Sequence, residues 1–193
     1  MQFALPVVWV AWVEREALRW PRWGWSGVGA GLILGLLIGG AMWGLYLLLS
    51  ESSVMRQATG PIQQKISDLG IDSLWRFAAL GVFYSLVHSL LEEYYWRWFV
   101  FGRLRKGAAL GVAIAVSSIA FALHHVVVLW HYFSHAPAIA ILFSAGVAVG
   151  GAIWAGLYHH SRSLLGPWLS HLLVDAAIFT IGIHLAWPLM TAG

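Results

Sequence analysis

The chain is dominated by apolar segments that are long enough to cross a lipid bilayer. A membrane-spanning α-helix needs about 20 apolar residues, and a backbone inside the hydrocarbon core must satisfy its hydrogen bonds within the segment. Segments of this kind cover residues 27–49, 74–101, 107–130, 138–158 and 167–190. We therefore expect an all-α fold, a polytopic transmembrane helical bundle of about five to six spans.

The composition excludes a soluble domain and several kinds of partner. Hydrophobic residues make up 60% of the chain and charged residues 10%, against about 45–50% and about 25% in soluble domains. No Lys/Arg run of the kind that binds nucleic acid is present, so no nucleic-acid partner is expected. The absence of cysteine excludes disulfides and thiolate metal sites. The lipid bilayer is the expected surrounding.

The chain divides into three parts. Residues 1–26 are an N-terminal interfacial or re-entrant segment, because the apolar residues 2–13 are too short to span. Residues 27–73 hold the first clear span and a polar surface loop, with a short surface helix broken at Gly60-Pro61. Residues 74–193 form the helical core that carries the ionisable residues.

Small residues recur at helical spacing in two of the spans. Gly27, Gly31, Gly35 and Gly39 make one bare stripe on the first span, and such a stripe lets another helix approach closely. The fourth span has further small-residue pairs, Gly146/Gly150 and Ala152/Gly156. We expect all of them to serve helix packing.

Basic residues predict the orientation. Seven of them fall in residues 14–26, 102–106 and 159–166, against three in the opposite loops. Cytoplasmic loops carry the excess of Lys and Arg. The end of the bundle that contains residues 14–26, 102–106 and 159–166 is therefore expected to face the cytoplasm.

Two adjacent carboxylates and an arginine lie inside the second apolar segment. Ionised groups at membrane depth are costly and mark functional sites. Glu93 and Arg97 are four residues apart and share a helix face, whereas Glu92 lies about 100° further round. We expect Glu93–Arg97 to be a structural ion pair, and Glu92 to be a free carboxylate that faces a polar cavity and acts as general base on water.

Two later spans supply possible partners for Glu92. His125 lies four residues after Phe121, and His171 lies four before Asp175. In one interpretation Glu92 and His125 activate water, and His171 and Asp175 stabilise the oxyanion. In the other, Glu92, His125 and His171 hold a Zn²⁺ whose bound water attacks. Six further histidines are expected to be peripheral: His124, His131, His135, His159, His160 and His184.

The predicted bounds of the spans place the candidate site residues at different depths in the membrane. Glu92 would lie about 14 Å, and His171 only about 6 Å, from the same end of the bundle, whereas His125 would lie nearer the far end of its span. We expect a later start of the third span, or tilted and broken helices, to remove the mismatch.

Three motifs in order resemble those of a known family. They are Glu92-Glu93-Tyr-Tyr-Trp-Arg97, Phe121-Ala-Leu-His-His125 and His171-Leu-Leu-Val-Asp175. They are similar to the Glu-Glu-x-x-x-Arg, Phe-x-x-x-His and His-x-x-x-Asn/Asp motifs of the CPBP intramembrane proteases. That family is also called Abi or the type II CAAX prenyl endopeptidases, and the resemblance covers roughly residues 75–185.

The resemblance implies a membrane endopeptidase that acts on a peptide or protein, with a C-terminal tail as one candidate substrate. Residues 74–193 would be its catalytic core. Glu92 and His125 would activate the water, His171 and Asp175 would complete the site, and Glu93, Arg97 and Phe121 would support it. The resemblance leaves a glutamic and a metallo-type mechanism open, so Zn²⁺ stays the one cofactor to consider.

The sequence departs from the family pattern at two positions. Trp98 follows the motif arginine where Gly is common, and Asp175 replaces the commoner Asn. An Asp here would orient His171 or carry a proton. A short chain without a eukaryotic targeting signal is similar to the prokaryotic branch. We therefore expect an integral protein of a prokaryotic plasma membrane.

Three other functions remain open on the residues alone. The chain could be a non-catalytic membrane scaffold, or a maturation or immunity partner, that keeps the motifs by descent. It could be a rhomboid-like serine protease that uses Gly24-Trp25-Ser26-Gly27 with His171. It could also bind haem or metal ions through its nine histidines.

Overall fold

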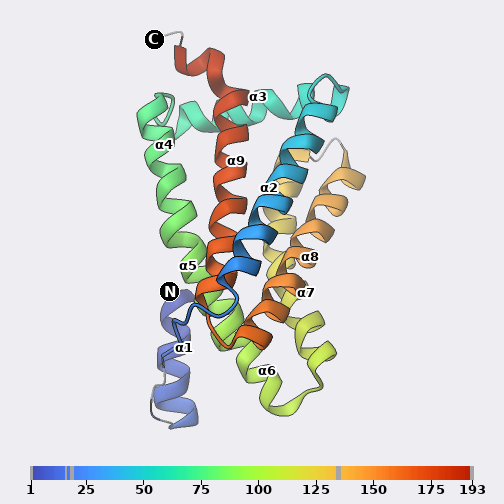
Figure 1. The fold of residues 1–193 in the computed structure, drawn as a ribbon. Coiled ribbons are helices and arrows are strands. Elements are labelled where there is room, and N and C mark those ends of the chain that lie inside the picture. Colours follow the sequence, from blue (N-terminus) through green and yellow to red (C-terminus); the bar gives the residue numbers. More distant parts are fainter. Residues whose placement is uncertain (1, 16, 18–19, 134–135, 192–193) are drawn as a thin grey trace.

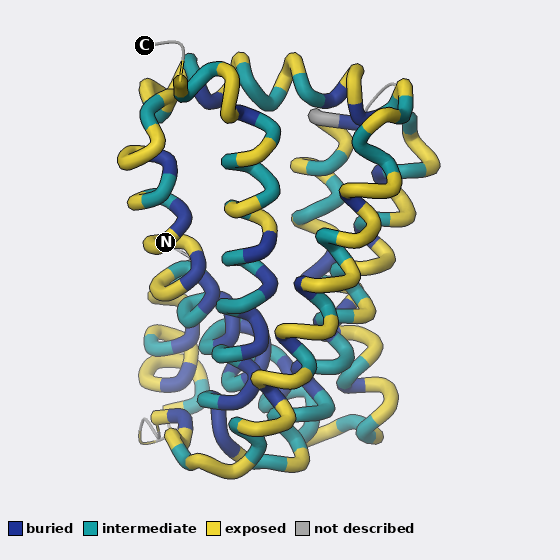
Figure 2. The backbone as a smooth tube through the Cα atoms, turned by 45° about the horizontal axis from the view of Figure 1, so that its top comes forward, coloured by how far each residue is buried: buried dark blue, intermediate teal, exposed yellow. Residues whose placement is uncertain are grey.

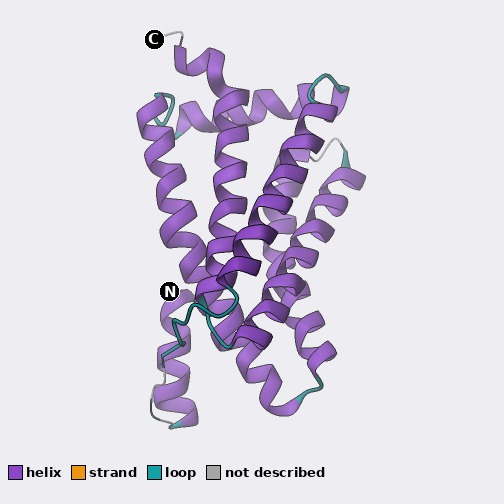
Figure 3. Ribbon diagram, viewed as in Figure 1, coloured by secondary structure: helices purple, strands orange, loops and turns teal. Residues whose placement is uncertain are grey.

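The computed structural model describes residues 2–15, 17, 20–133 and 136–191. Within these residues the chain is built from helices joined by short loops, without strands (Figure 3). Five helical segments are long and apolar enough to cross a membrane: α2 (Val28–Leu49), Leu74–Gly107, α7 (Leu110–Phe133), α8 (Pro137–Ser161) and α9 (Leu165–Thr191). The expected all-α polytopic bundle is confirmed (Figure 1).

The second span is one long helix with two π-helical stretches. It runs as α4 (Leu74–Phe83), a π-helical stretch (Tyr84–His88), α5 (Ser89–Glu93), a second π-helical stretch (Tyr94–Phe101) and α6 (Gly102–Gly107). It therefore extends beyond residue 101, where we expected a basic turn to begin. π-Helical turns are frequent at functional sites, and here they flank the two glutamates.

The longer second span removes the mismatch in depth between Glu92 and His125. Glu92 lies as far before Gly107 as His125 lies after Leu110, about 22 Å of helix in each case. The two residues therefore reach similar heights on either side of the turn between α6 and α7.

His171 reaches the same level because α9 begins inside the protein. Leu164 and Pro167 are buried, and the Leu164 N–H donates to the Arg22 carbonyl oxygen at 3.0 Å. The Gly24 N–H donates to Ser163 Oγ at 2.9 Å. Residues 20–27 thus cover the start of α9, and Figure 1 shows α6 reaching further down than that start.

The glycine stripe of α2 packs against the start of α9. A Cβ on Gly31 would lie 2.8 Å from the Gly166 carbonyl carbon and closer still to its oxygen, and one on Gly35 would lie 2.9 Å from Leu173 Cβ. A Cβ on Gly39 would lie 3.2 Å from Ala177 Cβ. The predicted role of the stripe in close helix packing is confirmed.

The small residues of α8 behave differently from the expectation. A Cβ added at Gly146 or Gly156 would meet no heavy atom within 4 Å, and one at Gly150 would meet only Trp154 of its own helix. Gly151 is the residue that lets α7 approach, because its Cβ would lie 3.3 Å from Ser118 Cβ. The pairing of Gly146 with Gly150 as a packing face was wrong, because no atom of another helix lies within 4 Å of either Cβ position.

A surface helix closes one end of the bundle. This helix, α3 (Ser53–Asp68), crosses the ends of the long helices in Figure 1. It continues through Pro61, so the break expected at Gly60-Pro61 was wrong. Ala58 and Ile66 are buried against the bundle, and this packing offsets the cost of about 3 kcal/mol for proline inside a helix.

The N-terminal residues form a short apolar helix at the other end of the bundle. It contains α1 (Leu5–Val8) and continues to Glu14. Glu14 pairs with Arg103 at 2.8 Å and with Lys106 at 3.7 Å. Figure 2 shows that the buried residues gather in the half of the bundle near this helix. The buried ionisable side chains of Glu92, Glu93, Arg97 and His171 are among them.

Candidate active site

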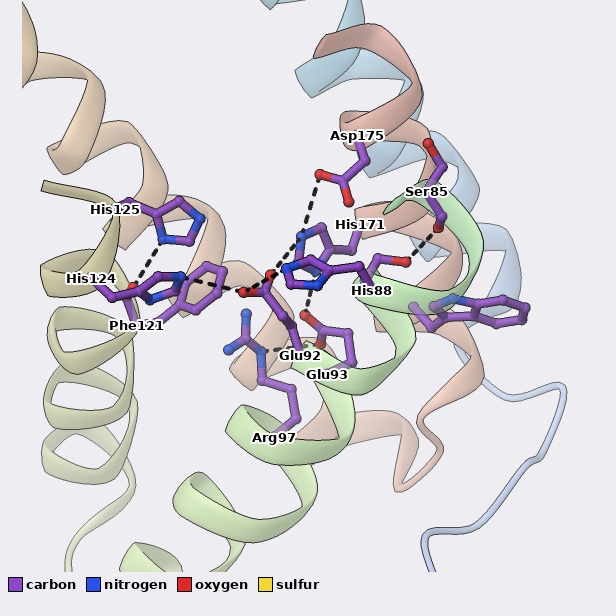
Figure 4. Close-up of polar contacts among 12 residues, drawn as sticks. Ser85, His88, Glu92, Glu93, Arg97, Phe121, His124, His125, His171 and Asp175 are labelled. Atoms are coloured by element: carbon purple, nitrogen blue, oxygen red, sulfur yellow. Dashed lines mark hydrogen bonds and ion pairs between the residues drawn. The ribbon is translucent and has the colours of Figure 1, made fainter. Parts of the chain in front are cut away.

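Arg97 and Glu93 form a fully buried ion pair. Both side chains are 0% exposed, and Arg97 Nε lies 3.1 Å from Glu93 Oε2 (Figure 4). The guanidinium also lies over the rings of Phe121 and Trp154, at 4.8 and 5.3 Å from their centroids. Arg97 is therefore paired with Glu93 within its own span and contacts α7 and α8 through the two aromatic faces.

His171 is held between the two glutamates. Its Nδ1 lies 2.9 Å from Glu93 Oε1, and its Nε2 lies 3.6 Å from Glu92 Oε2. The Trp154 ring stacks on the imidazole at 4.1 Å, and the indole N–H donates to Ser170 Oγ at 2.9 Å. These contacts fix the orientation of the ring and leave Nε2 facing Glu92.

Glu92 is buried and lies among three histidines. His88 Nε2 and His124 Nε2 each lie 3.4 Å from Glu92 Oε1, and His171 approaches the other oxygen. The expectation that His124 is peripheral was wrong, because the rotation of α7 brings this residue toward Glu92. His88 was missed, although it lies four residues before Glu92, the same spacing that identified Glu93 and Arg97.

His125 lies beside His124 but contacts the backbone. Its Nδ1 donates to the Phe121 carbonyl oxygen at 3.1 Å, and its ring centroid is 3.9 Å from that of His124. A neutral imidazole that donates from Nδ1 has a lone pair free at Nε2. His125 can therefore accept a hydrogen bond or hold a ligand beside Glu92.

Asp175 reaches the same cluster at a greater distance. Its Oδ1 lies 3.7 Å from His171 Nε2, which is beyond a hydrogen bond. Glu93 is the carboxylate closest to the His171 ring, at 2.9 Å. The imidazole is therefore oriented by Glu93, with Asp175 facing its opposite nitrogen.

The remaining histidines lie outside the cluster. His184 Nδ1 lies 2.6 Å from the Tyr46 hydroxyl, His131 and His160 are exposed, and His159 is half-buried at the end of α8. His135 lies outside the described residues. Ser26 of the Gly-Trp-Ser-Gly string is exposed, whereas His171 is buried beside the glutamates.

A metal ion would find a different set of ligands from the expected one. In the described part of the chain, Glu92, His124 and His125 bring one donor atom each within 4.8 Å of one another. The expected trio had His171 in place of His124; His171 directs Nδ1 to Glu93 and keeps Nε2 toward Glu92, but it is not part of this closely spaced set of donor atoms. Two imidazole nitrogens and one carboxylate oxygen fit the ligand preference of zinc.

The fold and this cluster define a class of protein: a polytopic helical membrane protein with a buried Glu/His site between π-helical turns. The sequence model of one protein family, described as type II CAAX prenyl endopeptidase Rce1-like, matches residues 74–177. The match covers just over half of the chain and includes every residue of the cluster. The chain belongs to this family, whose members are CAAX protease-type intramembrane endopeptidases. Comparisons with curated proteins and with solved structures gave no significant match.

Proposed function

We propose that this protein hydrolyses a peptide bond near the membrane surface, with Glu92 as the general base. The observation that carries the proposal is the Glu92 carboxylate, buried and contacted by histidines from three different helices. Such a cluster is costly to bury and contributes little that a hydrophobic core could not. Family membership supports the same reaction class.

The proposed reaction needs one water and one carboxylate. Glu92 takes a proton from the water as the oxygen attacks the peptide carbonyl carbon. His125, whose Nε2 is free to accept, positions the water. The C–N bond then breaks, and the leaving amine takes the proton back from Glu92.

His171 is proposed to stabilise the oxyanion. Glu93 holds its ring by Nδ1, so Nε2 is presented toward Glu92 and Asp175. In the imidazolium form Nδ1–H donates to Glu93 and Nε2 also carries a proton, and a donor fixed in this way contributes most when charge develops on the substrate oxygen. Asp175 would assist as the protonated acid, or through His171. Glu93, Arg97 and Phe121 position the site.

A zinc-dependent variant of the reaction uses overlapping residues. Glu92, His124 and His125 would hold the ion, which would lower the pKa of a bound water and polarise the carbonyl. His171 and Asp175 keep their places beside the substrate in either case.

The substrate is proposed to be a peptide or protein segment, with a C-terminal tail as the candidate that family membership suggests. Residues 20–27, the turn after α6 and the turn before α9 lie at one end of the bundle (Figure 1). This end carries the basic excess, so we place it in the cytoplasm of a prokaryotic cell, with the protein in the plasma membrane.

Cleavage of a fluorogenic peptide library by purified protein in detergent tests the proposal. Glu92→Gln is expected to abolish cleavage while the protein stays folded. Glu51→Gln is the matched control, because the Glu51 side chain is 96% exposed. Undiminished cleavage by Glu92→Gln would contradict the general-base role.

A chelator arm separates the two mechanisms. Cleavage that survives the chelator but not Glu92→Gln indicates a glutamate-based protease. Cleavage that is lost with the chelator and returns with Zn²⁺ indicates the metal-assisted variant. No cleavage of any peptide by the wild type, including C-terminal tails in vesicles, would favour the non-catalytic scaffold or partner role.

A further inference from the structure

A cavity of about 430 Å³ lies at the cytoplasmic end of the bundle, apart from the Glu/His cluster. Three segments form it: residues 20–22, the end of the second span and the end of α8. Each contributes an arginine, namely Arg22, Arg105 and Arg162. None of the residues in the Glu/His cluster lines it.

The charge of this cavity is not compensated by its own walls. Among the described residues that line it there is no carboxylate. Glu14, which comes from the same end of the molecule, is engaged by Arg103 and Lys106. Arg105 donates from Nη1 to the Ala108 carbonyl oxygen, and its other N–H groups, together with those of Arg22 and Arg162, can donate to an anion.

The cavity lies where the headgroups of a membrane leaflet would lie. Arg105 lies in the last turn of the second span, which ends at Gly107, and Arg162 directly follows α8, which ends at Ser161. Trp20 stacks on Trp98 at 6.5 Å and is 64% exposed. Tryptophans of this kind mark the interface between bilayer and water.

We propose that this cavity binds the phosphate of an anionic phospholipid. Basic pockets between membrane helices on the cytoplasmic side suit anionic headgroups, and Arg matches phosphate oxygens in two-point geometry. The aromatic walls, Trp20 and Trp98 among them, suit the glycerol and upper acyl region.

Such a lipid would join three segments of the chain at one point. The segment that contains Arg22 also covers the start of α9, since the Arg22 carbonyl accepts from Leu164. A phosphate bound to Arg22, Arg105 and Arg162 would therefore steady the N-terminal segment over the helix that carries His171. The proposal rests on the cavity alone and holds whether or not Glu92 is the general base.

Binding is measured on the full chain in a non-ionic detergent, by native mass spectrometry and by thermal unfolding followed through the 13 tryptophans. Short-chain phosphatidylglycerol is expected to bind and raise the melting temperature, and phosphatidylcholine of the same chain length is not. Each of Arg22→Gln, Arg105→Gln and Arg162→Gln is expected to weaken binding about fivefold. Arg76→Gln, an exposed arginine in the helix at the opposite end, should leave it unchanged.

A variant with Lys at all three arginine positions is the control for a folding defect in the triple Arg→Gln variant. It keeps the charge and should bind phosphatidylglycerol, whereas the triple Arg→Gln variant should not. Equal binding by wild type and the triple Arg→Gln variant would overturn the proposal. Inorganic phosphate that binds as tightly as the lipid would overturn it too, as would a peptide with a free C-terminal carboxylate that displaces the lipid when its amide does not.

Discussion

His171 joins the two adjacent glutamates, with Nδ1 2.9 Å from Glu93 Oε1 and Nε2 3.6 Å from Glu92 Oε2. Neighbouring residues on a helix point about 100° apart, so a single side chain from another helix must lie between them to contact both. The arrangement separates the roles of the two carboxylates. Glu93 orients the imidazole and pairs with Arg97, and Glu92 is left facing the histidines of the site.

Glu93→Gln is expected to cost folding stability as well as cleavage. Arg97 is 0% exposed, and removing its partner leaves a buried charge unpaired, at a cost of about 3–5 kcal/mol. Thermal unfolding in detergent measures the loss. The double variant Glu93→Gln/Arg97→Met should recover part of the stability but no cleavage. A single variant that melts like the wild type would show that the ion pair is not structural.

His88→Ala and His124→Ala are each expected to lower kcat about tenfold, the equivalent of one hydrogen bond to a charged group. Both rings contact the same oxygen of Glu92, so each positions the carboxylate without touching the substrate. KM should change little. Steady-state kinetics beside the exposed control His160→Ala checks this, and a change confined to KM would assign the two rings to substrate binding.

The apolar periodicity and the helical spacing of charges predicted most of the bundle. Glu93 and Arg97 could be paired from the sequence because both lie on one helix, where spacing fixes geometry. The contact from His171 to Glu93 could not, since it depends on how α9 rotates against α5. The same limit explains His124, because adjacent residues 124 and 125 differ only in the rotation of α7, and packing sets that rotation.

The ends of the helices were the least predictable part. The basic residues after Phe101 suggested a turn, yet Arg103 and Lys106 extend the helix and pair with Glu14. That partner lies far away in the sequence and carries no local signal. The break expected at Pro61 was wrong for a related reason. Tertiary packing of the buried face of α3 stabilises a helix that the proline alone would break.

Asp175→Asn is expected to keep cleavage, and Asp175→Leu to lose it. Asp175 Oδ1 lies 3.7 Å from His171 Nε2, close enough for an amide to take its place without a clash. An amide N–H could then donate to the oxyanion directly. Kinetics of the two variants, with unfolding as the control for stability, tests this. An inactive but stable Asp175→Asn variant would mean that the carboxylate itself is required.

Gly31→Ala is expected to destabilise the protein by about 1–3 kcal/mol, the usual cost of overpacking, and to lower cleavage. The new Cβ would lie 2.8 Å from the Gly166 carbonyl carbon, and a backbone atom cannot move aside as a side chain can. α2 and α9 must separate, and α9 carries His171. Gly29→Ala is the matched control on the same helix, since nothing lies within 4 Å of its Cβ position and alanine favours a helix over glycine. Thermal unfolding of both variants gives the comparison. If Gly31→Ala and Gly29→Ala have the same melting temperature, the glycine stripe does not set the distance between α2 and α9. The position of His171 must then depend on other contacts.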